Sequence, residues 1–248
     1  MTLGTPTLAT RTRIKICGLT REQDVDTAVV AGADAIGFVR YAKSPRFVSI
    51  ERAVELARRL PPFVTPVLLY VNEAVTTIRA DQAQMPNALA QFHGDETPFE
   101  CDTLTSQGAW RYLRAARIPL GDGAAAFDLV KYAHDYPNAQ AILLDAHVEG
   151  FGGGGKTFNW SLLPTNVNAH LVLSGGLNAA NVADGILQVR PRCKTLAVDV
   201  SSGVEAASPD GGTQKGIKDA VKINQFVAAV RAADQLLAGT IHERLPTA

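Results

Sequence analysis

Short apolar runs, rich in β-branched residues, alternate along the chain with longer segments of helical periodicity. In the longer segments, such as 21–33 (REQDVDTAVVAGA) and 49–60 (SIERAVELARRL), apolar residues recur three and four positions apart, which predicts amphipathic helices. Ser49 is a suitable N-cap for the second of these, although Arg52 stands where a capping box needs Glu or Gln. The predicted strands are 13–19, 33–39, 63–71, 87–94, 110–118, 141–146, 170–176 and 195–203.

The longest predicted helix covers residues 216–239, near the end of the chain. Its periodicity directs four apolar side chains towards one side, which we expect to face the protein core. These residues are Val221, Ile223, Phe226 and Val230. The last stretch, 237–248, is polar and is predicted to be a flexible tail.

Eight strands that alternate with helices predict a parallel sheet, because each helix carries the chain back to the start of the next strand. Most of the predicted strands are continuous apolar runs, as expected when both faces of a sheet are buried. Eight strand–helix units in 248 residues match the size of a closed (β/α)₈ barrel, and an open doubly wound sheet is the alternative. No linker or shift in composition divides the chain, so residues 13–236 are predicted to form one barrel domain after a disordered arm at 1–12.

Charge and cysteine content narrow the choice of partners and compartment. The formal net charge of zero argues against a broad basic surface, so we expect neither nucleic acid nor an anionic membrane as a partner. Cys17, Cys101 and Cys193 are too few and too scattered for a disulfide framework, and no C-x-x-C pair suggests a zinc site. This usage is typical of a reducing cytoplasm. No apolar run approaches the roughly 20 residues that span a bilayer, and the N-terminus lacks the apolar segment of a secretory signal.

Residues 150–157, GFGGGGKT, match the G-x-x-x-x-G-K-[ST] pattern of a phosphate-binding loop. Such a loop needs a strand directly before it and a full helix directly after it, because the helix N-terminus helps to bind the phosphates. Here four residues separate Asp145 from the first glycine, and only FNWSLL precedes Pro164. The aspartate in LAVDV (196–200) keeps an ATPase or GTPase as an alternative, but we favour a glycine-rich lid over the mouth of a barrel.

In a barrel of this kind, functional residues gather at the C-terminal ends of the strands and in the loops that follow. Two of those loops, SGGLN (174–178) and DVSSGVE (199–205), are glycine-rich and follow the seventh and eighth predicted strands. Barrels commonly bind phosphate there on backbone N–H groups, so we favour a phosphate site over simple tight turns. The candidate residues are Gly175, Gly176, Ser201, Ser202 and Gly203.

Three other strand ends carry side chains with acid–base chemistry. Cys17 ends the first strand and is either a small buried apolar residue or a base or nucleophile. Asp145 follows four apolar residues, where a carboxylate is costly unless it is paired or protonated, so we favour a functional role. His93 either orients a neighbour or satisfies a hydrogen bond in the core. Cys101 and Cys193 lie in helix or loop contexts and are expected to be inert.

Taken together, the motifs at these strand ends resemble those of phosphoribosylanthranilate isomerase, an enzyme family of tryptophan biosynthesis. The resemblance spans about residues 13–232, and two departures from the family pattern are Gly154 and Asn159, where serine and aspartate are frequent. Segment 208–219 also looks slightly longer than usual. The motifs are KICGLT (15–20), GADAIGFV (32–39), SPR (44–46), QFHGDE (91–96), LLDA (143–146), GFGGGGKTF (150–158), LVLSGGLN (171–178), AVDVSSGVE (197–205) and GIKD (216–219).

The resemblance implies a (β/α)₈ barrel that catalyses the Amadori rearrangement of N-(5-phosphoribosyl)anthranilate to 1-(2-carboxyphenylamino)-1-deoxyribulose 5-phosphate. It implies Cys17 as general base, Asp145 as general acid and Arg46 as the arginine at the anthranilate side, with Gln91 and His93 as further substrate-binding candidates. For this chemistry we expect burial and hydrogen bonding to keep Asp145 protonated, and local charge to lower the pKa of Cys17. No metal or organic cofactor is implied, and the expected assembly is a monomer or a homodimer.

Two other functions fit the pattern less well. A histidine-pathway aminoketose isomerase requires paired aspartates at the ends of the first and fifth strands, where this chain has Cys17 and RAARI (114–118). A phosphosugar-binding protein without activity would not need both Cys17 and Asp145. The isomerase is therefore the favoured prediction.

Overall fold

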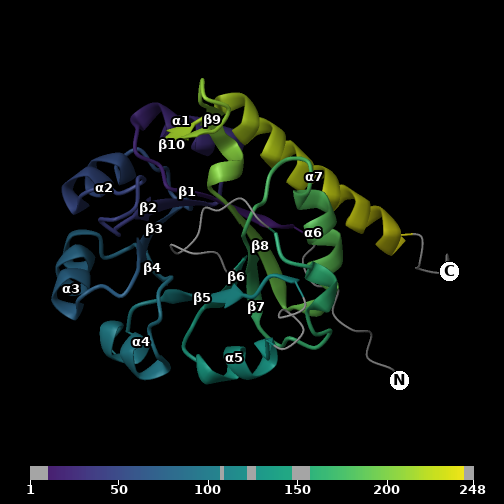
Figure 1. Ribbon diagram of the computed structural model, residues 1–248, viewed down its shortest axis with the longest axis horizontal. Helices are drawn as coiled ribbons and strands as arrows, with labels where there is room; N and C mark the ends of the chain where they lie inside the picture. The colour runs from purple at the N-terminus through teal and green to yellow at the C-terminus, as the bar shows by residue number, and fades with distance from the viewer. Residues whose placement is uncertain (1–10, 107–108, 122–126, 147–156, 243–248) are drawn as a thin grey trace.

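The computed structural model describes residues 11–106, 109–121, 127–146 and 157–242, which form a closed barrel of eight parallel strands (Figure 1). Each strand pairs with the next, and β8 pairs in parallel with β1 to close the ring. The predicted barrel is confirmed, and the open doubly wound sheet is excluded. The strands are β1 (Arg13–Cys17), β2 (Ala35–Val39), β3 (Thr65–Tyr70), β4 (Leu89–Phe92), β5 (Tyr112–Ile118), β6 (Ala141–Ala146), β7 (His170–Leu173) and β8 (Thr195–Val200).

The helices surround the barrel as an outer ring (Figure 1). The side chain of Ser49 accepts a hydrogen bond from the backbone N–H of Arg52, which confirms Ser49 as the N-cap of the second helix. None of the helices in the described part of the chain is long and apolar enough to cross a membrane. They are α1 (Glu22–Ala31), α2 (Ile50–Ala57), α3 (Val75–Gln84), α4 (Pro98–Leu104), α5 (Leu129–Asp135), α6 (Val182–Val189) and α7 (Ala220–His242).

Side chains alternate along the strands between two environments. Outward-facing residues, such as Ile142 and Leu144 on β6, belong to the large core beneath the helices. Inward-facing residues Ala115, Leu143 and Val172 form a separate small cluster inside the barrel. Further towards the C-terminal ends of the strands, the buried inward positions become polar. These polar residues include Lys15, Gln91, Asp145 and Asp199.

A hairpin occupies part of the segment that was predicted to begin the last helix. Residues from 216 onward were expected to be helical, but β10 (Thr213–Lys218) pairs antiparallel with β9 (Glu205–Ala207). The hairpin is fixed by tertiary contacts: the backbone N–H of Gly216 donates to the buried Glu205 carboxylate at 2.8 Å. Thr20, in the loop after β1, donates its hydroxyl proton to the carbonyl of Gly216 at 2.7 Å.

Helix α7 begins only after this hairpin, at a cap formed by Asp219. The Asp219 carboxylate accepts hydrogen bonds from the backbone N–H groups of Val221 and Lys222. Ile223, like Phe226 and Val230, is fully buried as predicted, whereas Val221 is 63% exposed. The prediction for Val221 is wrong because two residues correspond to about 200° around a helix, which turns this side chain away from that of Ile223.

The two ends of the folded region also differ from the predicted boundaries. Thr12, which the sequence analysis placed in the N-terminal arm, is fully buried. Its backbone N–H and its hydroxyl both donate hydrogen bonds to the carboxylate of Asp234 on α7. Helix α7 itself continues to His242, beyond the predicted boundary at 236. The residues just before β1 are thus tied to the last helix.

Candidate active site

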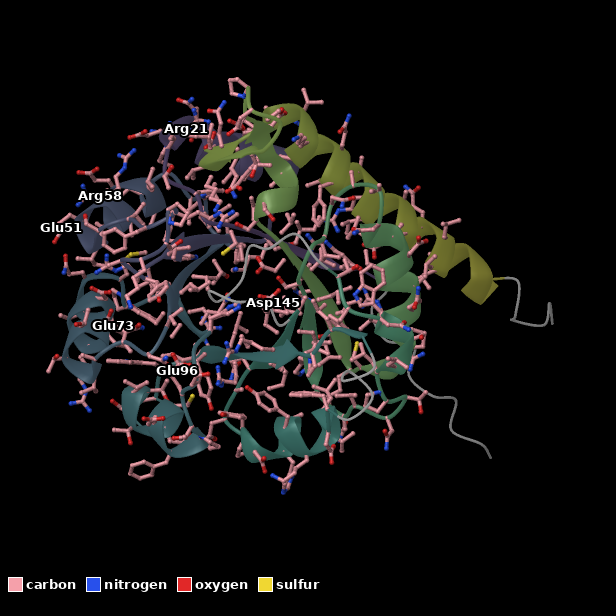
Figure 2. The ribbon with its side chains drawn as sticks, viewed as in Figure 1. Arg21, Glu51, Arg58, Glu73, Glu96 and Asp145 are labelled. Carbon is pink, nitrogen blue, oxygen red and sulfur yellow. The ribbon has the colours of Figure 1, made fainter. Side chains whose placement is uncertain are left out.

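A cavity of about 360 Å³ opens at the C-terminal ends of the barrel strands. Figure 2 shows Asp145, one of the residues in its wall, near the middle of the ring of strands and helices. Gln91 and Gly203 are not part of the wall, although both were candidates for direct contact with a substrate. The candidates that do line the cavity are Cys17, Arg46, His93, Asp145, Gly175, Gly176, Ser201 and Ser202.

Cys17 ends β1, and Lys15 lies two residues earlier on the same inward face of the strand. The ammonium group of Lys15 donates a hydrogen bond of 2.8 Å to Asp199 on β8, and both side chains are buried. Gly37 on β2 provides the space for this pair of side chains. A Cβ atom there would lie 2.7 Å from the sulfur of Cys17 and 3.1 Å from Cε of Lys15. The bare backbone of β2 therefore allows a thiol and an ammonium group to sit side by side.

Burial and neighbouring charges together set the pKa values of Cys17 and Lys15. Burial raises the pKa of the Cys17 thiol, and the positive charge of Lys15 offsets this only in part. Local charge does lower this pKa, as expected, but the net shift is upward, because the cost of removing the thiolate from water is larger than the stabilisation by its cationic neighbours. Burial also lowers the pKa of Lys15, but Asp199 and Cys17 raise it to about 12 overall, so Lys15 is cationic at neutral pH.

Asp145, near the end of β6, is 5% exposed and contacts the imidazole of His93. Nε2 of His93 lies 2.9 Å from Oδ2 of Asp145, and Nδ1 of His93 lies 2.9 Å from Nε2 of Gln91. Gly175, with a φ of +78°, passes close to this carboxyl group. A Cβ atom on Gly175 would lie 2.9 Å from Oδ1 of Asp145 and 2.6 Å from the backbone nitrogen of Ala146. Glycine at this position lets the loop after β7 form part of the wall beside Asp145.

Arg46, in the loop after β2, is held in the cavity wall by Glu205. Nε and Nη2 of Arg46 donate hydrogen bonds of 2.6 and 2.8 Å to the two carboxylate oxygens of Glu205. Lys218 of β10 also contacts Glu205, at 3.3 Å. Although burial raises it, the pKa of Glu205 lies below its ordinary value because Arg46 and Lys218 hold the carboxylate in its charged form. Arg46 is thus oriented by a carboxylate 159 residues away in the chain.

The loops after β7 and β8 are packed directly against each other. A Cβ atom on Gly203 would lie 1.9 Å from the carbonyl oxygen of Leu177, so only glycine fits at this crossing. Gly18, after β1, has a φ of +75° and lies close to Ser201, since its Cβ position is 3.2 Å from that hydroxyl. Three loops therefore meet at one end of the cavity, where Gly176 and Ser202 form part of the wall.

The sequence analysis assigned no role to Lys15, Glu205 and Lys218, and it suggested Asp199 only for the ATPase or GTPase alternative. The available signal was a charged residue within an apolar run, as for Lys15 in RIKIC and Asp199 in AVDV. Within the described ranges, no group of three or more His, Cys, Asp or Glu residues is arranged to hold a metal ion. Cys101 and Cys193 are buried free thiols away from the cavity.

The sequence profile of a family described as N-(5'phosphoribosyl)anthranilate (PRA) isomerase matches residues 14–229. The chain belongs to the phosphoribosylanthranilate isomerase family. The N-(5'-phosphoribosyl)anthranilate isomerase of Methylibium petroleiphilum is 58% identical over 230 residues, which cover 93% of this chain and 99% of that relative. The enzyme of the same name from Leptothrix cholodnii is 60% identical over 224 residues, with coverages of 90% and 93%.

Solved structures of phosphoribosylanthranilate isomerases share the barrel. The enzyme from Thermotoga maritima superposes with a TM-score of 0.74 at 36% identity, covering 89% of this chain and 99% of that chain. A phosphoribosylanthranilate isomerase in complex with reduced 1-(O-carboxyphenylamino)-1-deoxyribulose 5-phosphate gives a TM-score of 0.71 at 34% identity, with the same coverages.

The family membership also helps to decide between the two interpretations of the glycine-rich segment at 150–157. After Thr157 the described residues contain only a short 3₁₀ turn, η2 (Trp160–Leu162), before β7. A phosphate-binding loop of a nucleotide hydrolase requires a full helix there. The family and this turn together argue against the ATPase or GTPase alternative. Residues 150–156, including Gly154 and Lys156, lie outside the described residues, so the lid remains a prediction.

Proposed function

We propose that this chain converts N-(5-phosphoribosyl)anthranilate into 1-(2-carboxyphenylamino)-1-deoxyribulose 5-phosphate, with Asp145 as general acid and Cys17 as general base. The observation that carries this proposal is that the two side chains line one cavity from different strands, β6 and β1. The family membership supplies the reaction class. A related enzyme forms a complex with a reduced form of the proposed product, which supports the choice of substrate.

The first step opens the sugar ring. Asp145 donates a proton to the ring oxygen, the bond between this oxygen and C1 breaks, and the anthranilate nitrogen forms a Schiff base with C1. The positive nitrogen of the Schiff base makes the proton on C2 more acidic. This role requires Asp145 to carry its proton before the reaction, and the carboxyl group is buried against the imidazole ring of His93.

The second step moves the C2 proton. Cys17 as a thiolate removes this proton, which gives an enolamine. A proton is then added to C1 and the proton of the C2 hydroxyl group leaves, which yields the ketone. The cationic Lys15 beside Cys17 favours the thiolate at the moment it forms. Two protons are added and two are removed, so the product is an isomer of the substrate, and the proposed steps need neither a metal nor an organic cofactor.

The cavity wall also offers groups that can bind the two anionic ends of the substrate, the anthranilate carboxylate and the phosphate. Glu205 occupies Nε and Nη2 of Arg46, and Nη1 has no hydrogen-bond partner among the described residues, which suits a bond to the anthranilate carboxylate. For the phosphate, the backbone of Gly175–Gly176 and Ser201–Ser202 offers N–H groups in the parts of the cavity wall that follow β7 and β8. Gly203 supports this end of the cavity by allowing the loops to pack.

The decisive experiment follows the loss of fluorescence of N-(5-phosphoribosyl)anthranilate on addition of the purified protein. The wild type is expected to consume the substrate at a rate proportional to protein concentration. Asp145→Asn should lower kcat by about 10²–10⁴-fold with little change in KM, because an amide cannot deliver the proton. Absence of turnover by the wild type contradicts the function. A defect of Asp145→Asn confined to KM contradicts the assignment of Asp145 as acid.

The assembly is proposed to be a monomer or a homodimer. A related structure is described as mutually generated monomers of the dimeric enzyme from Thermotoga maritima, at 33% identity and a TM-score of 0.68 over 89% of this chain and 99% of that chain. Both states therefore occur with this barrel, and sedimentation of the purified chain distinguishes them.

A further inference from the structure

A buried row of polar side chains leads from Asp145 into the barrel, away from the cavity. His93 lines the cavity beside Asp145, whereas Gln91, two residues earlier on the inward face of β4, is fully buried and absent from the cavity wall. Gln91 therefore contacts His93 rather than a substrate. The role of this row matters because the proposed function requires a protonated Asp145.

The Gln91 amide can present either its NH₂ group or its carbonyl oxygen to His93, since the two ends exchange by a half-turn of the side chain. When the NH₂ group faces His93, it must donate to Nδ1, so the ring proton of a neutral imidazole lies on Nε2. Nε2 then donates to Asp145, which stabilises the carboxylate rather than the acid. This orientation also leaves the buried Oε1 of Gln91 without a hydrogen-bond partner.

The other orientation reverses every hydrogen bond in the row. Oε1 of Gln91 accepts the proton of Nδ1, so Nε2 of a neutral His93 carries a lone pair. At 2.9 Å from Oδ2, this lone pair can accept a hydrogen bond from a protonated Asp145. The 2.9 Å separations on both sides of the ring suit either direction of donation.

Charge separates the two arrangements. The first buries a carboxylate against a neutral ring and leaves a net negative charge at a site that is 5% exposed. The second is neutral overall, as is an ion pair of imidazolium and carboxylate, but only the second leaves on Asp145 the proton that the proposed acid role requires. In the second arrangement Oε1 gains the donor that it lacks in the first, and the NH₂ group takes the place that Oε1 leaves.

We propose that Gln91 is a positioning residue whose carbonyl oxygen holds His93 in the Nδ1–H tautomer, so that His93 keeps Asp145 protonated by accepting its hydrogen bond. This inference rests on the proposed role of Asp145 as general acid. It assigns to Gln91 and His93 a function in setting the protonation of the acid, in place of substrate binding by Gln91.

The direct test is ¹⁵N NMR of the wild-type protein labelled in histidine, since the two ring nitrogens report separately which of them is protonated. The signals of His93 are assigned by their loss in His93→Gln. We expect the proton on Nδ1 and none on Nε2 at neutral pH. A proton on Nε2, in either a neutral or a doubly protonated ring, overturns the proposal whether or not the enzyme is active.

A matched pair of variants tests the link to catalysis. Gln91→Met removes the acceptor at similar volume, so we expect the Nδ1–H signature to be lost and kcat to fall about tenfold or more with little change in KM. Gln82→Met removes another buried glutamine, on α3 and outside the cavity wall, and should leave both unchanged. An unchanged kcat in a folded Gln91→Met variant overturns the positioning role. If instead the proposed acid role of Asp145 is wrong, Asp145→Asn will be fully active, which is a different result.

Discussion

Cys17 and Asp145 enter the cavity from β1 and β6 and meet opposite chemical surroundings. Lys15 and Lys218 place positive charge near the thiol, which Asp199 offsets in part, whereas His93, a ring that can be neutral, contacts the carboxyl group. Cationic neighbours favour a thiolate, and a neutral hydrogen-bond acceptor favours a carboxylic acid. Two buried groups can therefore be biased towards the base and acid roles by the residues beside them.

The role of Cys17 is tested by Cys17→Ser, which keeps the size of the side chain and replaces the thiol by a much weaker acid. A serine hydroxyl is almost never ionised at neutral pH, so we expect kcat to fall by about 10²-fold or more with KM nearly unchanged. Steady-state kinetics and the thermal midpoint of both proteins provide the measurement. A kcat close to that of the wild type removes Cys17 from the mechanism.

The pH dependence of kcat/KM should show the titration of Cys17. Because burial raises its pKa above the ordinary value of 9.0, the free enzyme carries mostly thiol at neutral pH. The active thiolate fraction, and with it kcat/KM, should therefore increase with pH by up to about tenfold per unit below that pKa. Cys17→Ser is the control, since its residual rate should lack this rise. A profile that is flat or declining between neutral and mildly alkaline pH contradicts the prediction.

At the scale of elements, the phosphate end of the cavity depends on how closely two loops approach. Gly203, after β8, crosses the backbone of Leu177, after β7, where a Cβ atom would lie 1.9 Å from a carbonyl oxygen. A contact this short with backbone cannot be relieved by rotating a side chain. The loops would have to separate, and the backbone groups of Gly176 and Ser202 would move with them.

Gly203→Ala is therefore expected to weaken phosphate binding more than it slows the proton transfers. We expect KM and the inhibition constant for inorganic phosphate to rise about tenfold or more, and the free energy of unfolding to fall by about 1–3 kcal/mol. Gly212→Ala is the control, because a Cβ atom on this exposed glycine of the β9–β10 turn would lie 3.4 Å from Oδ1 of Asp210, which is an ordinary contact. Phosphate inhibition unchanged from the wild type would refute the role of this crossing.

The barrel strands could be predicted from the sequence, whereas the β9–β10 hairpin could not. The eight strands are apolar runs whose pattern is local, so their number and order followed from the chain alone. The β9–β10 hairpin did not, because residues 216–218 continue the helical pattern of α7 and are held as a strand by contacts with Thr20 and Glu205. Tertiary contacts overrode the local pattern at that point.

In the candidate site, too, some residues could be predicted from local sequence and others could not. Cys17 and Asp145 were found because each follows an apolar strand, which is a local feature. The partners that tune the site are remote: Lys15 and Asp199 are 184 residues apart, and Arg46 and Glu205 are 159 apart. Only the closed barrel brings such pairs together, so no spacing in the sequence could reveal them. The raised pKa of Cys17 was missed for the same reason, because burial is a property of the assembled barrel.

For the whole molecule, the end of the barrel opposite the cavity is fastened by the first and last described elements. Figure 1 shows α7 running along the outside of the barrel, and it packs against α1 and α6. Thr12 precedes β1, and its N–H and hydroxyl donate to Asp234 on α7. Arg231 also donates to the carbonyl of Thr12, at 2.7 Å, and Arg190 donates to its hydroxyl at 2.5 Å. This cluster lies at the N-terminal end of β1, while Cys17 lies at the C-terminal end.

Asp234→Ala is expected to lower stability without affecting the reaction. The variant leaves the buried N–H and hydroxyl of Thr12 without their acceptor, and each such loss costs about 1–3 kcal/mol. For a chain of this size, a cost of about 2–6 kcal/mol for the two losses corresponds to a decrease in Tm of roughly 4–24 °C. Calorimetry measures the change, and Gln235→Ala, at the exposed next position of α7, serves as the control with an expected change near zero.

At 25 °C, kcat and KM of Asp234→Ala should match the wild type, because the cluster and the cavity lie at opposite ends of the barrel. A Tm equal to that of the wild type would show that the fastening contributes nothing, and a selective loss of kcat would show that the two ends of the barrel are coupled.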